Sequence, residues 1–251
     1  MARVRVHRII SLNSYFDVST KEKVEAYLFN WLRRRAPMAR VSWELKASQD
    51  WLKEWKKHFK PFNLAGFKIV PAWESEKFKK RKNMLLIEPG MAFGTGTHPT
   101  TRFAVQMLKK VSKKLNGKSV LDVGAGSGIL SVVAEKLGAK NCVALDIDPE
   151  SWRECRKTFK LNNCKRCRVT TETLGEVRRK FDVVVANIID GVLMDMKEDL
   201  WRTVKPGGLI ILSGILADGA KAFRKSFLAG VSWRVLGEIS DGEWTSLLIS
   251  K

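Results

Sequence analysis

The feature that most constrains the fold of this chain is a regular alternation of apolar runs and amphipathic segments from Asn116 onward. The apolar runs, typical of strands that are buried on both faces, are 119–124, 141–146, 181–188 and 207–214. Segments with helical length and periodicity lie between them, at 127–137, 149–162 and 190–203. Because parallel strands are usually joined by helices, this pattern predicts an α/β protein with a doubly wound parallel sheet.

The last segment of the chain, 233–251, has a different pattern. Two strand-like runs flank the dipeptide Asp241-Gly242, which is common in the tight turns of hairpins. The end of the chain is therefore expected to form an antiparallel hairpin.

The first 60 residues have the pattern of a separate module. Alternating residues near 4–9 and 41–48 suggest strands, and apolar residues spaced by helical turns in 24–32 and 51–59 suggest helices. We expect a small α+β domain over residues 1–60. The stretch 61–83 mixes prolines, glycine and charge, so it is expected to be a linker to the main domain, 84–251.

The charge and the hydropathy of the chain indicate which classes of partner it could contact. The 46 Lys and Arg against 26 Asp and Glu give a net charge of +20, compatible with contact to nucleic acid and equally with a solvated basic surface. No apolar run approaches the roughly 20 residues of a membrane span, and the first residues lack the apolar core of a signal peptide. We expect a cytoplasmic monomer with no membrane partner.

The motif LDVGAGSG, 121–128, follows the first strand of the alternating region. Its glycines, Gly124, Gly126 and Gly128, allow the backbone to approach a ligand where the next helix begins. The spacing departs from the G-x-G-x-x-G of dinucleotide-binding proteins. Asp146 ends the next strand, where a carboxylate can accept hydrogen bonds from ribose hydroxyls. Loop and acid together predict a nucleoside ligand; the alternative is a tight turn with a capping aspartate.

Several segments together resemble one known family. They are PGMAFGTGTHPTT, VLDVGAGSGILSVVA, DIDP, VVANII and LIILSGIL, and with DWLKEW...KPF...IVPAWE the likeness covers roughly residues 50–220. The chain resembles the PrmA family, class I methyltransferases that trimethylate amino groups of large-subunit ribosomal protein eleven with S-adenosylmethionine. The resemblance implies a seven-stranded methyltransferase sheet, a small N-terminal substrate-recognition domain and a joining segment that acts as a hinge.

The resemblance also implies which residues contact the cofactor. The loop 88–102 would close over the methionine end of S-adenosylmethionine, with Phe93 beside the ligand and Thr101 at a binding position. Gly124 and Gly126 would bring backbone to the cofactor. No metal is expected at the site.

Two further positions match family contacts: Asp146, which is expected at the ribose, and Asn187, which ends the VVAN strand. Asn187 is the expected catalytic residue, because its side-chain carbonyl could hold the cofactor and orient the incoming amine. His98 is a candidate base by residue type, although in such a loop an imidazole more often makes a structural hydrogen bond. Glu172 or Thr173 is expected near the adenine.

The expected function is methylation of lysine and N-terminal amino groups of ribosomal protein eleven. The alternatives are a methyltransferase that acts on another protein lysine or on RNA, and a nucleic-acid-binding protein with a relict cofactor pocket. Cys164 and Cys167 have C-x-x-C spacing. Because Cys142 and Cys155 fall on a strand and a helix and form no second pair, this spacing is not interpreted as a metal site.

Overall fold

The structure is a computed structural model that describes residues 59–79, 82–88 and 96–251. All of these residues belong to one compact unit of the chain. The domain expected over residues 1–60 lies almost entirely outside the described residues and stays a prediction. In the described part of the chain, no helix is both long and apolar enough to cross a membrane.

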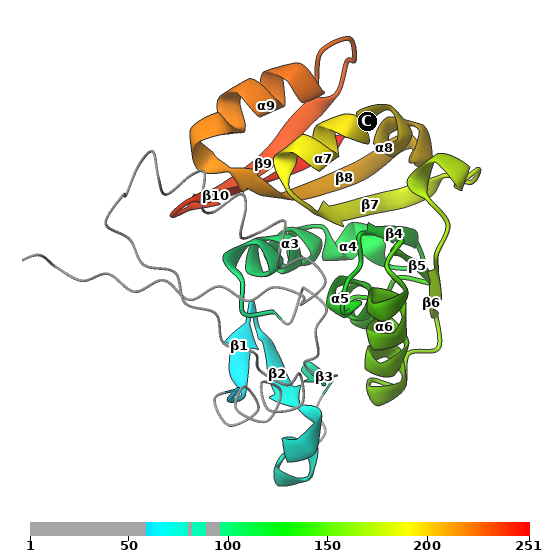
Figure 1. Cartoon of the computed structure of the whole chain (residues 1–251), viewed down its shortest axis with the longest axis vertical. Coiled ribbons are helices and arrows are strands. Elements are labelled where there is room, and N and C mark those ends of the chain that lie inside the picture. Colours follow the sequence, from blue (N-terminus) through cyan, green and yellow to red (C-terminus); the bar gives the residue numbers. More distant parts are fainter. Residues whose placement is uncertain (1–58, 80–81, 89–95) are drawn as a thin grey trace, which may run out of the picture. The chain divides into compact units, whose positions relative to one another are not determined.

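Seven strands form the main sheet in the order β6-β5-β4-β7-β8-β10-β9 (Figure 1). Their bounds are β4 Ser119–Val123, β5 Asn141–Leu145, β6 Cys167–Thr170, β7 Phe181–Asn187, β8 Val204–Leu216, β9 Arg234–Asp241 and β10 Trp244–Ser250. The pairs from β6 to β8 are parallel, whereas β10 pairs antiparallel with both β8 and β9. The seven-stranded α/β sheet and the C-terminal hairpin expected from the sequence are confirmed.

Helices cover both faces of this sheet. Their bounds are α3 Pro99–Lys110, α4 Ser112–Leu115, α5 Ile129–Lys136, α6 Pro149–Leu161, η3 Leu174–Glu176, α7 Asp190–Asp195, α8 Lys197–Thr203, η4 Ala217–Gly219 and α9 Ala220–Phe227. One core cluster joins α3 to α6 with one face, and a second joins η3 and α7 to α9 with the other. Successive strand residues alternate between the clusters, as Val120 and Leu121 do, so the sheet is doubly wound.

Two boundaries differ from the sequence prediction. The helix expected over 190–203 is divided at Met196 into α7 and α8, but Leu193 and Leu200 are buried in one cluster, which explains the single apolar period. Strand β8 begins at Val204 rather than after Pro206. Its regular pairing with β7 starts only at Leu209, past a register shift, because proline lacks the N–H that a ladder needs.

The range expected to be a linker contains secondary structure. β1 Phe62–Leu64, β2 Phe67–Pro71 and β3 Met84–Ile87 form a three-stranded sheet, and η2 Ala72–Lys77 leads from β2 toward β3. The turn between β1 and β2 has positive φ at Ala65 and Gly66, +48° and +88°, which suits a two-residue hairpin. The first part of 61–83 is thus a folded hairpin.

The small sheet is bonded to helices of the main fold. Asn162, at the end of α6, exchanges two hydrogen bonds with the backbone of Leu86: its Oδ1 accepts at 2.9 Å and its Nδ2 donates at 2.7 Å. Lys109 Nζ donates to the Ala65 carbonyl at 2.6 Å. Side chains of the small sheet also share a core cluster with α3 and α5. These contacts make β1 to β3 part of the core of the main fold.

Candidate functional site

The predicted site residues that the structure describes gather at the carboxyl ends of β4, β5 and β7. The chain runs from β4 to β5 and β6 on one side of the sheet, and then continues with β7 and β8 on the other side of β4. Ligands of open α/β sheets bind in the crevice at such a reversal. The glycine loop follows β4, Asp146 follows β5 and Asn187 ends β7, so three distant segments meet at this reversal, where a ligand crevice is expected.

The glycine loop turns sharply between β4 and α5. Gly124, Gly126 and Gly128 have φ angles of +64°, +52° and +75°, a region that strains residues with a Cβ. A Cβ on Gly124 would lie 2.8 Å from the Ile188 side chain, and one on Gly128 would lie 2.5 Å from Cys155 Sγ. Packing within the protein therefore already requires glycine at two of these positions.

Asp146 links the loops that follow β4 and β5. Its Oδ2 accepts a hydrogen bond from the Gly126 N–H at 2.8 Å, and its Oδ1 accepts from the Asp148 N–H at 3.0 Å. Helix α6 is capped by Asp148, whose carboxylate accepts from the N–H groups of Glu150 and Ser151. Asp146 is therefore not a helix cap. A carboxylate offers about four acceptor positions, so Asp146 has capacity left for two hydroxyl donors.

Asn187 and Thr101 are in contact although 86 residues separate them. The Asn187 Nδ2 donates to Thr101 Oγ1 at 3.3 Å. Thr101 is completely buried in the first turn of α3. This turn is tied to the sheet by Ser213 of β8, whose hydroxyl donates to the Thr100 carbonyl at 2.8 Å and which lies opposite Asn187 in the ladder. The amide of Asn187 is thereby held from the α3 side.

His98 is the N-cap of α3. Its Nδ1 accepts from the Thr100 N–H at 3.4 Å and lies 2.8 Å from Thr100 Oγ1, and its ring meets Trp244 edge to face at 5.1 Å. Pro99 occupies the first helical position, where its missing N–H has no cost. Burial lowers the pKa of His98, which favours the neutral imidazole. The imidazole makes the structural hydrogen bond that the sequence suggested.

The preceding loop is described only from Gly96, so Phe93, Gly90 and Gly94 lie outside the described residues. Gly96 has a φ of +90°, and a Cβ there would lie 3.2 Å from Phe62 and 3.3 Å from Ile129. The loop therefore ends in a tight approach between β1 and the start of α5.

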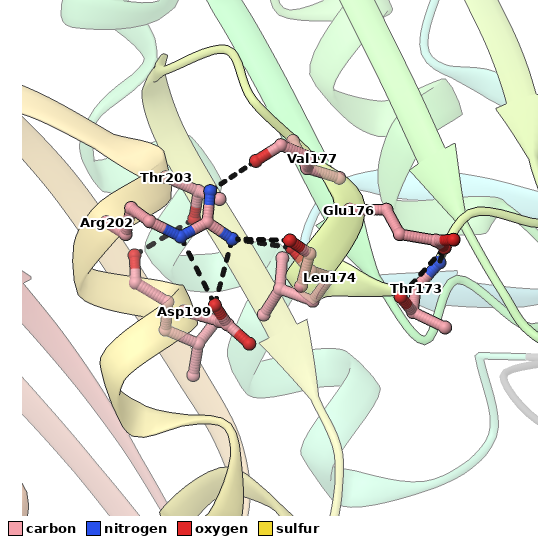
Figure 2. A network of polar contacts seen from close by, with 9 residues as sticks. Thr173, Leu174, Glu176, Val177, Asp199, Arg202 and Thr203 are labelled. Atoms are coloured by element: carbon pink, nitrogen blue, oxygen red, sulfur yellow. Dashed lines mark hydrogen bonds and ion pairs between the residues drawn. The ribbon is translucent and has the colours of Figure 1, made fainter.

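The turn after β6 is organised by its own hydrogen bonds (Figure 2). The hydroxyl and N–H of Thr173 both donate to Glu176 Oε2, at 2.8 and 2.7 Å, in a capping box. Arg202 of α8 donates to backbone carbonyls in 174–177, which anchors the turn to the neighbouring helix. The Thr173 hydroxyl is engaged within this turn, while Glu172 is exposed.

Two residues beside the crevice were not singled out from the sequence. Asp122 of β4 is 1% exposed; its Oδ2 accepts from the N–H and hydroxyl of Ser131, and burial raises its pKa to about 7. A carboxylate inside an apolar strand motif was the available signal. Ile147, next to Asp146, is 70% exposed. No local sequence pattern predicts that this isoleucine side chain is exposed to solvent.

The chain was compared with known families and structures. The family model described as Ribosomal protein L11 methyltransferase (PrmA) matches residues 1–251. A ribosomal protein L11 methyltransferase from Dictyoglomus thermophilum is 35% identical over 224 residues, which cover 87% of this chain and 73% of the relative. The protein of the same name from Staphylococcus aureus is 33% identical over 251 residues, 96% of this chain and 80% of the relative.

A solved structure agrees with these sequence relatives. The crystal structure of ribosomal protein L11 methylase from Lactobacillus delbrueckii subsp. bulgaricus superposes with a TM-score of 0.70 at 32% identity, and the match covers 77% of this chain and 99% of that one. This structural likeness agrees with the strand order of the main sheet. It also agrees with the convergence of the glycine loop, Asp146 and Asn187 at the carboxyl ends of the central strands. The chain belongs to the ribosomal protein L11 methyltransferase (PrmA) family.

Proposed function

We propose that this protein transfers methyl groups from S-adenosylmethionine to lysine and N-terminal amino groups of ribosomal protein L11. The observation that carries the proposal is the convergence at the carboxyl ends of β4, β5 and β7, where Asp146 bonds to the glycine loop and Asn187 bonds to Thr101. A nucleoside-binding loop beside a fixed amide suits transfer of a group from a nucleoside cofactor to an amine. The names of the relatives support the choice of acceptor.

The residues at the crevice fit this cofactor. Gly124 and Gly126 offer close approach to backbone, and Asp146 has acceptor capacity for both ribose hydroxyls. The exposed side chain of Ile147 offers an apolar face for the adenine. By family resemblance, Thr101 and Phe93 are proposed at the methionine end. When bound, S-adenosylmethionine supplies a methyl carbon that its sulfonium already activates.

Asn187 is proposed as the catalytic residue because of how its amide is held. The Nδ2 donates to Thr101, which leaves the carbonyl Oδ1 as the acceptor for an N–H of the incoming amine. That hydrogen bond would direct the nitrogen lone pair toward the methyl group. Positioning of this kind is the main contribution that a protein can make to displacement at an activated carbon.

The amine must be neutral when it attacks, whereas a free lysine has a pKa of about 10.4. Two titratable side chains close to the motif residues serve other purposes: His98 caps α3, and Asp122 is buried and accepts from Ser131. We therefore propose that no side chain acts as the base. Removal of water around the amine lowers its pKa, and the proton leaves to solvent.

Acceptor recognition is proposed for residues 1–60, as the family resemblance implies. The joining segment 61–83 remains the proposed hinge, and its first part is the folded hairpin of β1 and β2. Asn162 and Lys109 bond the small sheet to α6 and α3, which opposes free movement of β1 to β3. Contact with ribosomal RNA through the +20 charge is proposed as an aid to association with the ribosomal subunit.

A parallel transfer assay tests the proposal. Radiolabelled S-adenosylmethionine is incubated with the full chain and with free ribosomal protein L11, ribosomal RNA or whole large subunits. We expect label in the protein fractions. Label in RNA alone would overturn the proposed acceptor, and label in no fraction would overturn the proposed function.

Calorimetry with the cofactor tests the binding site separately. Asp146→Ala should weaken cofactor binding by about 1.5 to 3 kcal/mol, the scale of hydrogen bonds to a charged group. Glu154→Ala is the matched control, because Glu154 is a partly buried acid on α6 that pairs with Lys157. Equal affinities of the two variants would remove Asp146 from the cofactor site.

A further inference from the structure

All four cysteines of the chain are free thiols. Although their spacing in the sequence gives only one C-x-x-C pair, three of them lie close together in the structure. Cys142 of β5 lies directly opposite Cys167 of β6 in the parallel ladder, and the Cys142 N–H donates to the Arg166 carbonyl at 2.8 Å. The Cys167 thiol donates to the Ser131 carbonyl at 3.5 Å and lies near the thiols of Cys142 and Cys164. Strand pairing thus brings a third sulfur to the C-x-x-C motif.

A carboxylate completes this cluster. Glu135, in the last turn of α5, accepts the Lys165 N–H at Oε1, 2.9 Å, and the Arg166 N–H at Oε2, 3.0 Å. Its ligand atom and the sulfurs of Cys164 and Cys167 all lie within 4.8 Å of one another. The two cysteines and the carboxylate therefore face a common point.

The local fold explains how the two cysteines come to face Glu135. Helix α6 ends at Leu161, and Asn163 takes a φ of +53°, which turns the chain back so that the Cys164 N–H donates to the Phe159 carbonyl at 3.0 Å. Strand β6 begins at Cys167. The two N–H groups between the cysteines are the ones that Glu135 accepts, so the loop is fixed at both ends and in its middle.

We propose that Glu135, Cys164 and Cys167 form a binding site for a thiophilic divalent metal ion of the zinc class. In a tetrahedral zinc site, bonds of about 2.0 to 2.3 Å separate the ligand atoms by about 3.8 Å or less. The separations in the cluster, within 4.8 Å, therefore exceed the separations of such a site by about 1 Å at most. The Cys142 thiol beside Cys167 is a further donor of the right kind.

The hydrogen bonds of Glu135 are compatible with metal binding. A carboxylate has about four acceptor positions, and two backbone donors occupy only part of them. Carboxylate ligands of metals are themselves commonly oriented by such hydrogen bonds. Sulfur donors favour zinc-class ions over magnesium and calcium, which prefer oxygen.

The position in the sheet indicates a structural role. Cys167 is the first residue of β6 and Cys142 the second of β5, so the site lies at the amino ends of these strands. The proposed methyl-transfer crevice lies at the carboxyl ends. A metal here would join α5 to the loop before β6 and would stabilise the fold without taking part in methyl transfer.

Cobalt titration of the full chain tests the proposal. After chelation and reduction, we expect one equivalent of Co²⁺ to produce thiolate-to-cobalt absorption, Zn²⁺ to displace it, and Zn²⁺ to raise the Tm, because metal binds the folded state. Mg²⁺ should neither displace Co²⁺ nor raise the Tm. Cys164→Ser/Cys167→Ser should lose the absorption. Glu135→Gln should weaken Co²⁺ binding by at least about 10-fold, whereas Glu154→Gln, which changes a partly buried acid on α6 outside the cluster, should not.

Three results would overturn the proposal. They are the absence of saturable cobalt absorption in the reduced chain, equal Co²⁺ affinity of Glu135→Gln and Glu154→Gln, and a Cys164–Cys167 disulfide in protein purified under reducing conditions. If the double cysteine variant does not fold by circular dichroism, the comparison of the two glutamine variants decides.

Discussion

The hydrogen bond between Asn187 and Thr101 gives the proposed catalytic amide its orientation. Thr101→Val removes the hydroxyl acceptor while the residue keeps its size, so the Asn187 amide loses its restraint. We expect turnover to fall by about 10-fold in Thr101→Val and by roughly 10- to 1000-fold in Asn187→Ala, the range that lost positioning produces. Single-turnover rates at saturating cofactor measure both effects.

The same rates across pH distinguish Asn187 from His98. His98→Ala should leave measurable activity with an unchanged pH profile, because the imidazole caps α3. Loss of the rising limb in His98→Ala, together with a wild-type rate in Asn187→Ala, would make His98 the base.

Burial of Asp122 links stability to pH. Its pKa is raised from 3.8 to about 7, so the folded protein holds a proton that the unfolded chain releases between these values. The stabilisation is complete below about pH 4 and is lost as the pH rises through about 7. The free energy of unfolding should fall in this window by up to about 1.4 kcal/mol per pH unit.

Asp122→Asn provides the comparison for this titration. Its side-chain carbonyl can still accept from Ser131, and it carries no titratable proton. Urea unfolding at several pH values should therefore show a flatter dependence for the variant than for the wild type. Parallel curves would show that Asp122 does not titrate in this range.

Among the elements, η3 depends on one side chain of α8. Arg202 donates to the carbonyls of Leu174 and Gly175 at 3.0 and 3.2 Å, and to that of Val177, and it also pairs with Asp199 at 2.8 Å (Figure 2). Arg202→Ala should lower the free energy of unfolding by about 1 to 3 kcal/mol, because carbonyls lose a charged donor. Urea unfolding and hydrogen exchange at 174–177 measure the loss.

Asp199→Asn is the control for the ion pair alone. The side chains of both partners are more than a third exposed, 35% for Arg202 and 41% for Asp199. Ion pairs as exposed as this one contribute about 0 to 1 kcal/mol to stability. We expect a smaller loss than in Arg202→Ala. An equal loss would mean that the ion pair, rather than the carbonyl bonds, holds η3.

On the scale of the whole molecule, the division of labour between the first residues and the main fold can be tested with fragments. Phe59 is 7% exposed and meets Phe62 and Trp73 edge to face, so a fragment should begin before it. We expect residues 55–251 to bind the cofactor but not to methylate ribosomal protein L11. Residues 61–251 should be less stable, because loss of a buried phenylalanine costs about 3 kcal/mol or more.

Calorimetry, urea unfolding and the transfer assay measure these three properties. Full activity of 55–251 on ribosomal protein L11 would contradict the proposal that residues 1–60 recognise the acceptor. Equal stability of the two fragments would contradict the role of Phe59 in the core.

Several parts of the fold and site could be predicted because their signals are local. The glycines at 124 and 126 mark a turn with positive φ, and the run 119–124 marks a strand buried on both faces. Asp146 could be placed near the loop because one strand-helix-strand unit joins them. The hairpin of β1 and β2 was missed, because its residues were interpreted as a linker from their prolines and charge.

By itself, then, the sequence determined the α/β class, the strands at 119–124, 141–146, 181–188 and 207–214, the C-terminal hairpin and the glycine loop, because apolar periodicity and turn residues act over short stretches of chain. The role of Asn187 was implied by the family resemblance. Only the tertiary structure decided that Asn187 meets Thr101, that α7 and α8 are separate, and that Glu135 faces Cys164 and Cys167. These contacts depend on strand order, ladder register and helix packing, which are set by the burial of the whole core.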